Sequence, residues 1–243
     1  MPTVRAAGWL ACAAAAVLGG CAGARLSAEP PAGMSLAGAW KLDHAASDDP
    51  QKALEQMRAQ ALKIISRRQQ QLAAQAAAPV RPGTRGGAGQ AGQQEPEAAD
   101  EDLALSTPGP NGRRPDPLQR SPMAHVILET MARGDFLTVR QSPEELVLDY
   151  GTSRRSFTPG ARSVVSTETG VGDQISGWKG HEYVIEVKGQ LGPEVTERYA
   201  LSSDGHELIE KLHIGAGELP AVNLTRIYRP TTEIAPQQLP RTD

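Results

Sequence analysis

Two carboxylates near the C-terminus have a spacing that could support acid–base chemistry. Glu197 and Glu210 lie on either side of Asp204-Gly205, a dipeptide typical of a tight hairpin turn. If these two residues form the turn, Tyr199 faces Glu210, and both glutamates lie on one side of the sheet. A facing pair of carboxylates could serve as acid and base, as in glycoside hydrolysis. We favour a structural interpretation, in which a cation neutralises them, because no other catalytic pattern accompanies the pair.

The same register predicts that this side of the hairpin faces the core, because it also carries three leucines. On the final strand Arg226 shares a face with Leu224 and Tyr228, so it is a candidate inward cation for the two glutamates. The register also places Arg198 opposite Lys211, which is unfavourable unless both are solvated.

The remaining polar residues form no catalytic or metal-binding pattern. The five histidines are scattered, and none has a spacing such as H-E-x-x-H. No G-x-S-x-G sequence and no phosphate-binding loop occurs. We therefore expect no catalytic residue, no metal, no cofactor and no enzymatic activity. The formal net charge of −3 argues against a nucleic-acid partner.

Residues 1–20 have the layout of a secretory signal peptide. Arg5 precedes a run of apolar or small residues, and two glycines lead into Cys21. The run is shorter than the about 20 apolar residues that a transmembrane helix needs. The only other cysteine, Cys12, lies within this segment. Cleavage before Cys21 would leave it as the sole cysteine of the mature chain, which excludes disulfides and cysteine-based zinc sites.

Leu18-Gly19-Gly20-Cys21 resembles the lipobox of bacterial lipoproteins. The resemblance implies cleavage between Gly20 and Cys21, a diacylglycerol on the thiol and an acyl chain such as palmitate on the new amine. More than one acyl chain gives stable membrane anchoring. Ala22 follows the cysteine, which by the family's sorting rule implies the outer membrane, facing the periplasm. The alternative is an ordinary secretory signal with a chance cysteine.

Composition divides the rest of the chain into segments. Residues 21–34 are small and contain proline, which predicts a tether. Residues 48–78 predict an inserted amphipathic helix, with Pro50 at a first helical position. Residues 79–118 contain no aromatic residue and are rich in Gly, Pro and Gln, so we expect a disordered insertion. We expect residues 231–243 to form a flexible tail.

The inserted helix has two interpretations. Its basic face could lie on an anionic membrane surface. We favour packing of its apolar stripe over an open edge or end of the β domain. A second, short helix is predicted between Ser121, which can cap its start, and Gly134, which can end it.

Alternation with a period of two predicts a β domain made of residues 35–43 and 119–230. Turn signals separate short runs, which predicts an antiparallel meander of about eight to ten strands. After the first strand, at 35–43, strands are expected near 136–141, 145–150, 153–158, 162–168, 173–178, 181–188, 194–201, 206–214 and 221–229. Such a meander favours a closed barrel, and the alternative is an open curved sheet or a sandwich.

Gly38-Ala39-Trp40 on the first strand, together with an arginine on the last, resembles the lipocalin and wider calycin barrels. The resemblance implies that the indole of Trp40 packs under Arg226, with Arg229 as the alternative, and closes one end of the barrel. It also implies a lipocalin-like domain that could bind a small apolar ligand. The G-x-W strand, followed later by a W-x-G hairpin (Trp178 to Gly180) and a D-G hairpin (Asp204-Gly205), also resembles uncharacterised lipoproteins of Gram-negative bacteria.

Three classes of function remain open. The first is a membrane-anchored envelope lipoprotein whose β domain binds a small apolar ligand or a protein partner. The second is a structural or assembly factor of the envelope that acts through the inserted helix and the disordered insertion. An enzyme is the third. A cavity lined by apolar residues and open at one end would favour binding, whereas a filled interior with an exposed apolar stripe over residues 54–72 would favour assembly.

Overall fold

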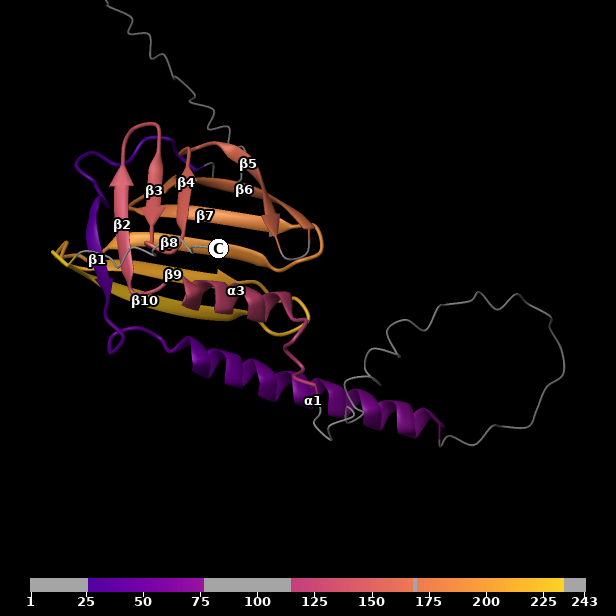
Figure 1. Cartoon of the computed structure of the whole chain (residues 1–243). Helices are drawn as coiled ribbons and strands as arrows, with labels where there is room; N and C mark the ends of the chain where they lie inside the picture. The colour runs from indigo at the N-terminus through magenta and orange to yellow at the C-terminus, as the bar shows by residue number, and fades with distance from the viewer. Residues whose placement is uncertain (1–25, 77–114, 168–169, 234–243) are drawn as a thin grey trace, which may run out of the picture.

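The computed structural model describes residues 26–76, 115–167 and 170–233. These residues form a ten-stranded antiparallel sheet and two helices (Figure 1). The predicted mainly-β meander is therefore confirmed. The predicted signal peptide of residues 1–20, the lipidation site Cys21 and most of the predicted insertion lie outside the described residues.

The strands follow the predicted segments closely. They form because apolar residues alternate with polar ones, so that one face of each strand can be buried. In β9, for example, Leu208, Glu210, Leu212 and Ile214 are buried, and the residues between them are more exposed. The strands are β1 (Gly38–Leu42), β2 (Phe136–Gln141), β3 (Leu146–Asp149), β4 (Arg154–Phe157), β5 (Arg162–Thr167), β6 (Gly170–Lys179), β7 (Glu182–Gly189), β8 (Glu194–Leu201), β9 (Leu208–Ile214) and β10 (Val222–Pro230).

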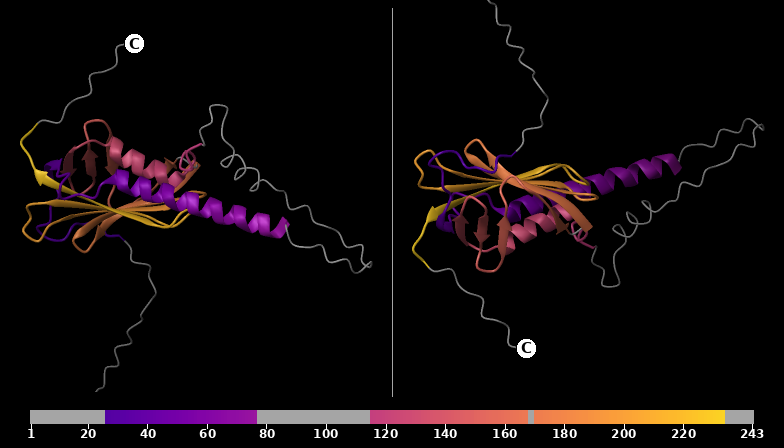
Figure 2. Two further views of the ribbon diagram at one scale, coloured as in Figure 1. Left: turned by 90° about the horizontal axis from the view of Figure 1, so that it is seen from below. Right: turned by 90° about the horizontal axis from the view of Figure 1, so that it is seen from above.

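The sheet curls on itself into a half-barrel (Figure 2). Its strand order is β4-β3-β2-β1-β10-β9-β8-β7-β6-β5, with neighbouring strands antiparallel. The first strand therefore lies inside the sheet, between the second and the last. Strands β4 and β5 follow each other in the chain but occupy the two edges of the sheet. This arrangement corresponds to the open curved sheet that was the alternative to full closure.

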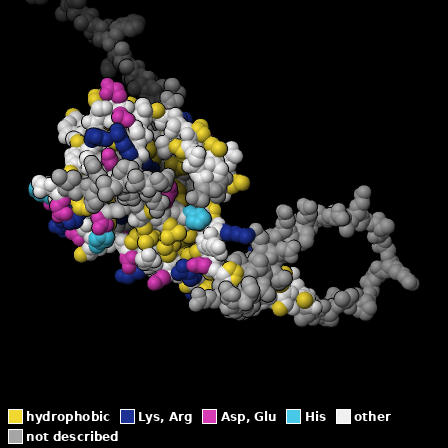
Figure 3. All heavy atoms as spheres, in the orientation of Figure 1, with side chains coloured by type: hydrophobic (Ala, Val, Ile, Leu, Met, Phe, Trp, Pro, Cys, Tyr) yellow, Lys and Arg dark blue, Asp and Glu magenta, His cyan; other side chains and the backbone are white. Residues whose placement is uncertain are grey.

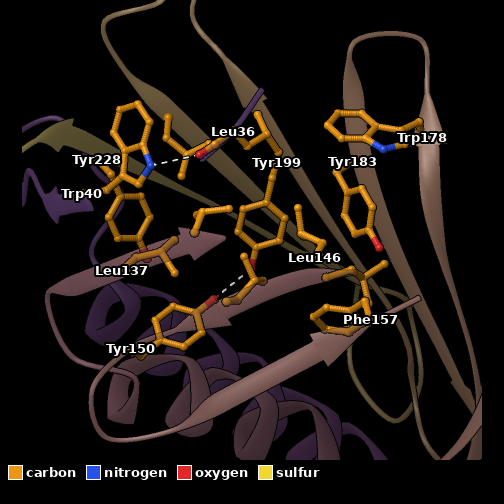
Figure 4. Close-up of a cluster of buried hydrophobic side chains, with 14 residues drawn as sticks. Leu36, Trp40, Leu137, Leu146, Tyr150, Phe157, Trp178, Tyr183, Tyr199 and Tyr228 are labelled. Atoms are coloured by element: carbon orange, nitrogen blue, oxygen red, sulfur yellow. Dashed lines mark hydrogen bonds between the residues drawn. The ribbon is translucent and has the colours of Figure 1, made fainter. Parts of the chain in front are cut away.

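Two groups of buried apolar residues hold the structure together. The first fills the inside of the curl and is rich in aromatic rings (Figure 4). There Tyr183 meets Trp178 and Phe157 edge to face, with ring centroids 5.2 and 6.4 Å apart. The second group lies between the helices and strands β8 to β10; it includes Met57, Ile127 and Leu212.

Helix α3 (Pro122–Ala132) begins where the sequence predicts. The Ser121 hydroxyl accepts a hydrogen bond from the backbone N–H of Ala124 at 3.2 Å, and Pro122 occupies the first turn. Gly134 follows with a φ of +76°, a conformation that glycine adopts without steric cost. The predicted cap and end of this helix are therefore confirmed.

Helix α1 (Pro50–Ala76) runs beside α3 in all views (Figures 1 and 2). Its buried residues are Ala53, Leu54, Met57 and Ala61. These belong to the apolar group beneath the helices, so the first half of α1 covers the sheet as predicted. Beyond Ala61 the helix projects past the sheet. Within the described segments, neither helix combines the length and apolarity needed to cross a membrane.

The ordered domain is wider than the sequence predicts at three boundaries. Leu26, in the predicted tether, is buried. Asp116, in the predicted insertion, forms an ion pair with Arg58 of α1 at 2.8 Å. Thr231, in the predicted tail, donates its backbone N–H to the Ala39 carbonyl at 2.9 Å. Each of these segments is held by long-range contacts that have no local sequence signal.

Candidate functional site

The hairpin of β8 and β9 brings the two predicted carboxylates into the interior. The register pairs Tyr199 with Glu210 and Glu197 with Leu212, as the Asp204-Gly205 turn predicts. Glu197 is 3% exposed and Glu210 is 0% exposed. Two acidic groups are thus removed from water, which requires compensating charge or hydrogen bonds.

The unfavourable cross-strand pair that the register implied is present but compensated. Arg198 lies opposite Lys211. Its guanidinium Nη1 also lies 3.2 Å from Glu182 Oε2 on β7. This neighbouring carboxylate offsets the repulsion, so no bulge is needed to relieve it.

Three guanidinium groups surround the buried carboxylates. Arg133 bridges them, with Nη2 2.9 Å from Glu197 Oε1 and Nη1 3.1 Å from Glu210 Oε1. Arg155 Nη1 lies 2.7 Å from Glu197 Oε2. Arg226 Nη1 lies 3.5 Å from Glu210 Oε2, so the predicted inward cation is the more distant of the two partners of that carboxylate. We call these five residues the charged cluster.

Tyrosine hydroxyls complete the hydrogen bonding of the charged cluster. Tyr199 Oη lies 2.7 Å from Glu197 and 3.0 Å from Glu210, and Tyr150 Oη lies 3.0 Å from Tyr199 Oη. Tyr228 donates to Glu210 at 3.0 Å. Among the described residues, every buried side-chain nitrogen and oxygen has a hydrogen-bond partner. The cluster is therefore a satisfied network, as buried polar groups require.

The network shifts the pKa values of Glu197 and Tyr150. Burial alone would raise the pKa of Glu197, but the guanidiniums of Arg133 and Arg155 outweigh burial and hold that pKa well below its usual value. Burial and the charge of Glu210 raise the pKa of Tyr150 to about 12. The cluster is made of three arginines and two glutamates, a formal charge of +1 (3 − 2).

A pocket of about 900 Å³ opens between α3, strand β4 and the sheet from β5 to β8. Much of its wall is apolar, from Val126, Phe157, Val165, Val187 and Val195. The charged cluster contributes Arg133, Arg155 and Glu197 to the wall. The pocket therefore offers apolar surface and one charged region. Within the described segments, no three acidic, histidine or cysteine residues group closely enough to hold a metal ion.

Sequence reasoning missed two of the three arginines. Arg155 shares a face of β4 with the buried Phe157, so strand parity could have identified it as inward. Arg133 follows α3, three residues after the buried Thr130, which is a helical spacing. Neither pattern predicts which carboxylates these arginines contact, because the carboxylates belong to a hairpin that is distant in the sequence.

Trp40 and Arg226 do not stack as the calycin resemblance implies. The Trp40 indole donates to the Leu36 carbonyl at 3.2 Å (Figure 4). The Arg226 guanidinium donates to the Gly134 carbonyl at 3.0 Å and lies 5.3 Å from the ring centroid of Tyr228. The aromatic ring that contacts the Arg226 guanidinium is therefore that of Tyr228, and not the predicted indole of Trp40.

The register of the central strands explains this difference. Trp40 on β1 pairs with Pro230, four residues beyond Arg226 on β10, so the two side chains enter the interior at different depths. The alternative, Arg229, pairs with Lys41 in the sheet, and its Nε lies 2.7 Å from Asp43 Oδ2. Its side chain is 61% exposed, so it cannot cap the core.

Comparisons with known proteins give partial likenesses. No model of a protein family matches the chain, and no curated protein matches it. Among solved structures, it is similar to lipid binding protein 8 of Caenorhabditis elegans, with a TM-score of 0.42 and 8% identity over 82% of this chain and 100% of that one. It is also similar to a fatty acid-binding protein from brain tissue of Drosophila melanogaster (TM-score 0.31, 24% identity, 39% and 70% covered) and to a zebrafish ileal bile acid-binding protein (0.31, 14%, 42% and 80%). All three TM-scores lie below 0.5.

Proposed function

We propose that the β domain binds a small amphipathic ligand in the pocket beneath α3. The observation that carries this proposal is the pocket of about 900 Å³, which joins an apolar wall to the charged cluster. Its volume is typical of pockets that enclose small organic ligands, about 300–1,000 Å³. Binding is favoured over catalysis because Glu197 and Glu210 are each held by guanidinium and hydroxyl partners.

The ligand carries an anionic group that meets Arg155. The charged cluster has one more cation than anions, and Arg155 is the most exposed of its arginines, with a side chain 25% exposed compared with 10% for Arg133 and 5% for Arg226. Both of its contacts with Glu197 use the same nitrogen, Nη1. A guanidinium presents five N–H donors in a fixed fork, so Arg155 retains donors for an anion in the pocket.

Competition between two probes of equal length tests this proposal. An environment-sensitive fluorescent probe bound in the pocket should be displaced by dodecanoate at a lower concentration than by dodecanol. Arg155→Met should weaken dodecanoate binding by about tenfold or more, the value of a charge-assisted hydrogen bond, and should leave dodecanol binding unchanged.

The neighbouring arginine supplies the control. Arg154 is exposed on the opposite face of β4, so Arg154→Met should not change the affinity for either compound. The proposal fails if no saturable binding occurs, or if the two variants weaken dodecanoate binding equally.

We also propose that the chain is anchored in the bacterial envelope, at the outer membrane facing the periplasm, by lipid on Cys21. The support is the Leu18–Cys21 sequence directly after an apolar signal run. Cys21→Ser should abolish incorporation of a radiolabelled fatty acid. Cys12→Ser is the matched control and should retain it, because Cys12 lies within the segment that is removed. Continued labelling of the Cys21→Ser chain would disprove the anchor.

A second candidate function is an assembly role of α1. Leu62, Ile64 and Leu72 are 48%, 43% and 50% exposed on the part that projects past the sheet, where Figure 3 shows hydrophobic side chains at the surface. If this part contacts another envelope protein, a photocrosslinking residue at position 69 should give a defined product in intact cells. Replacing Leu62 and Leu72 with Gln should abolish that product and leave dodecanoate binding unchanged.

A further inference from the structure

The first described residues, 26–28, are fixed to one end of the half-barrel, and we call them the strap. Ser27 and Trp178 exchange two backbone hydrogen bonds, each 2.8 Å long. Leu26 is buried. The strap therefore adds a short antiparallel bridge beside the end of β6.

Two glycines make this close approach possible. A Cβ at Gly177 would lie 2.6 Å from the Ser27 carbonyl oxygen, and one at Gly160 would lie 3.1 Å from the Ala28 Cβ. Real Cβ atoms essentially never come as close as the first of these distances. The strap can therefore pack at this position only because residues 160 and 177 have no side chain.

The strap and the pocket mouth lie at opposite ends of the sheet. The strap meets β6 next to the turn between β6 and β7, which contains His181. The residues that line the pocket include the exposed Thr152 and Ser153 and, in the turn between β7 and β8, Gly192. The eight residues of β7 separate those two turns, a rise of about 26 Å.

We infer that the strap holds the anchored domain with its pocket mouth directed away from the membrane that carries the lipid. The inference rests on the proposed anchor at Cys21 and the proposed pocket. The five residue steps from Cys21 to Leu26 can span at most about 18 Å. This reach is shorter than the about 26 Å from the strap end to the pocket end, so a domain inverted to rest its pocket end on the bilayer could not keep its anchor in the membrane.

The orientation identifies the source of the ligand. A carrier that loads from its own membrane needs its mouth at the bilayer surface. Here the mouth faces the aqueous compartment, and the projecting half of α1 lies at that same end (Figure 1). The ligand is therefore exchanged with the aqueous phase or with a soluble carrier, and not with the anchoring membrane.

A pair of single labels on the lipidated full-length mature chain tests this orientation. Cys21 is its only cysteine, and its thiol is blocked by lipid, so one added cysteine can be labelled alone. His181→Cys places a nitroxide at the strap end. Leu191→Cys, at a residue 83% exposed, places it at the pocket end. In vesicles that contain a nickel-chelating lipid, we expect relaxation enhancement at position 181 and none at position 191.

A longer tether is the matched control. Inserting twenty Gly/Ser residues between Gly23 and Ala24 should abolish the enhancement at position 181, while dodecanoate affinity stays unchanged. Equal or reversed enhancement at the two positions, in protein that floats with the vesicles, would overturn the orientation alone. Protein that does not float would overturn the anchor and the orientation with it, and dodecanoate binding in the same samples would report separately on the pocket.

Discussion

Glu210 is the most deeply buried member of the charged cluster. Partners from three elements compensate the burial of its carboxylate. Arg133 comes from the end of α3, Arg226 and Tyr228 from β10, and Tyr199 from β8. A buried ion pair adds little to stability when complete, but removal of one partner leaves an uncompensated charge. The arginine that contacts both carboxylates is therefore the most sensitive position of the cluster.

Replacing that arginine should destabilise the fold. Arg133→Leu removes one guanidinium from each of the two carboxylates, so we expect the free energy of unfolding to fall by about 3–5 kcal/mol. Urea unfolding followed by circular dichroism measures the change. Arg140→Leu on β2 is the control: its side chain is 55% exposed, and the expected change is within about 0.5 kcal/mol. Equal effects of both variants would contradict a structural role of the cluster.

Trp40 belongs to the core although it does not meet Arg226. It is 6% exposed and packs within the aromatic group inside the curl. Trp40→Ala should reduce the free energy of unfolding by about 3–5 kcal/mol, the usual cost of deleting a large buried side chain. Thermal unfolding measures it, and a change below about 0.5 kcal/mol would show that the indole does not support the core.

Local sequence patterns predict the two carboxylates of the candidate site but do not predict the arginine that bridges them. Hairpin parity places Glu197 and Glu210 on the inner face, because a turn fixes the register of both strands. Arg133 is 64 and 77 residues away from these carboxylates in the chain, and no local spacing links it to them. The stacking of Trp40 on Arg226 was predicted from a family pattern, and the register of β1 against β10 overturns it.

At the scale of elements, the strands and helices were the more predictable features. One-sided burial imposes a period of two on each strand, which is visible in the sequence before any partner is known. The open seam between β4 and β5 was not predictable, because it depends on how far the sheet curls. Helix α1 divides in the same way: its first half packs against α3 and the sheet, whereas Leu62, Ile64 and Leu72 of its second half are exposed.

The two halves of α1 should respond differently to the same kind of substitution. Met57 is 1% exposed, so Met57→Ala should lower the free energy of unfolding by about 2–5 kcal/mol. Leu72 is exposed on the projecting half, and Leu72→Ala should change it by less than about 0.5 kcal/mol. Denaturant titration of both variants measures the difference. A large loss in the Leu72 variant would mean that the projecting half is packed in the isolated protein.

For the molecule as a whole, the buried tyrosines set an alkaline limit of stability. All four tyrosines of the chain are buried. Burial raises the pKa of Tyr150 and of Tyr183 to about 12, and burial together with the charge of Glu197 holds the pKa of Tyr199 well above its usual value. An unfolded tyrosine ionises near pH 10, so folding favours the protonated form.

The direction of the pH dependence follows from these raised values. The stability contributed by the protonated tyrosines is complete below about pH 10 and is lost as the pH rises through the folded pKa values. We expect little tyrosinate absorbance at 295 nm at pH 10.5, followed by a single cooperative rise when the protein unfolds. Gradual ionisation from about pH 9.5, with the melting temperature unchanged, would contradict the burial of these hydroxyls.

The central position of β1 has a consequence for the order in which the chain can fold. This strand is the first to be synthesised, yet it pairs with β2 and with β10, whose residues begin at Val222. Its edge that faces β10 cannot pair until nearly the whole domain has emerged. Closure between such distant segments is slow because the loop entropy is lost before the new contacts form. Until then the earliest strand of the nascent chain can pair on one side only, and a chain shortened before β10 would leave that strand with one neighbour instead of two.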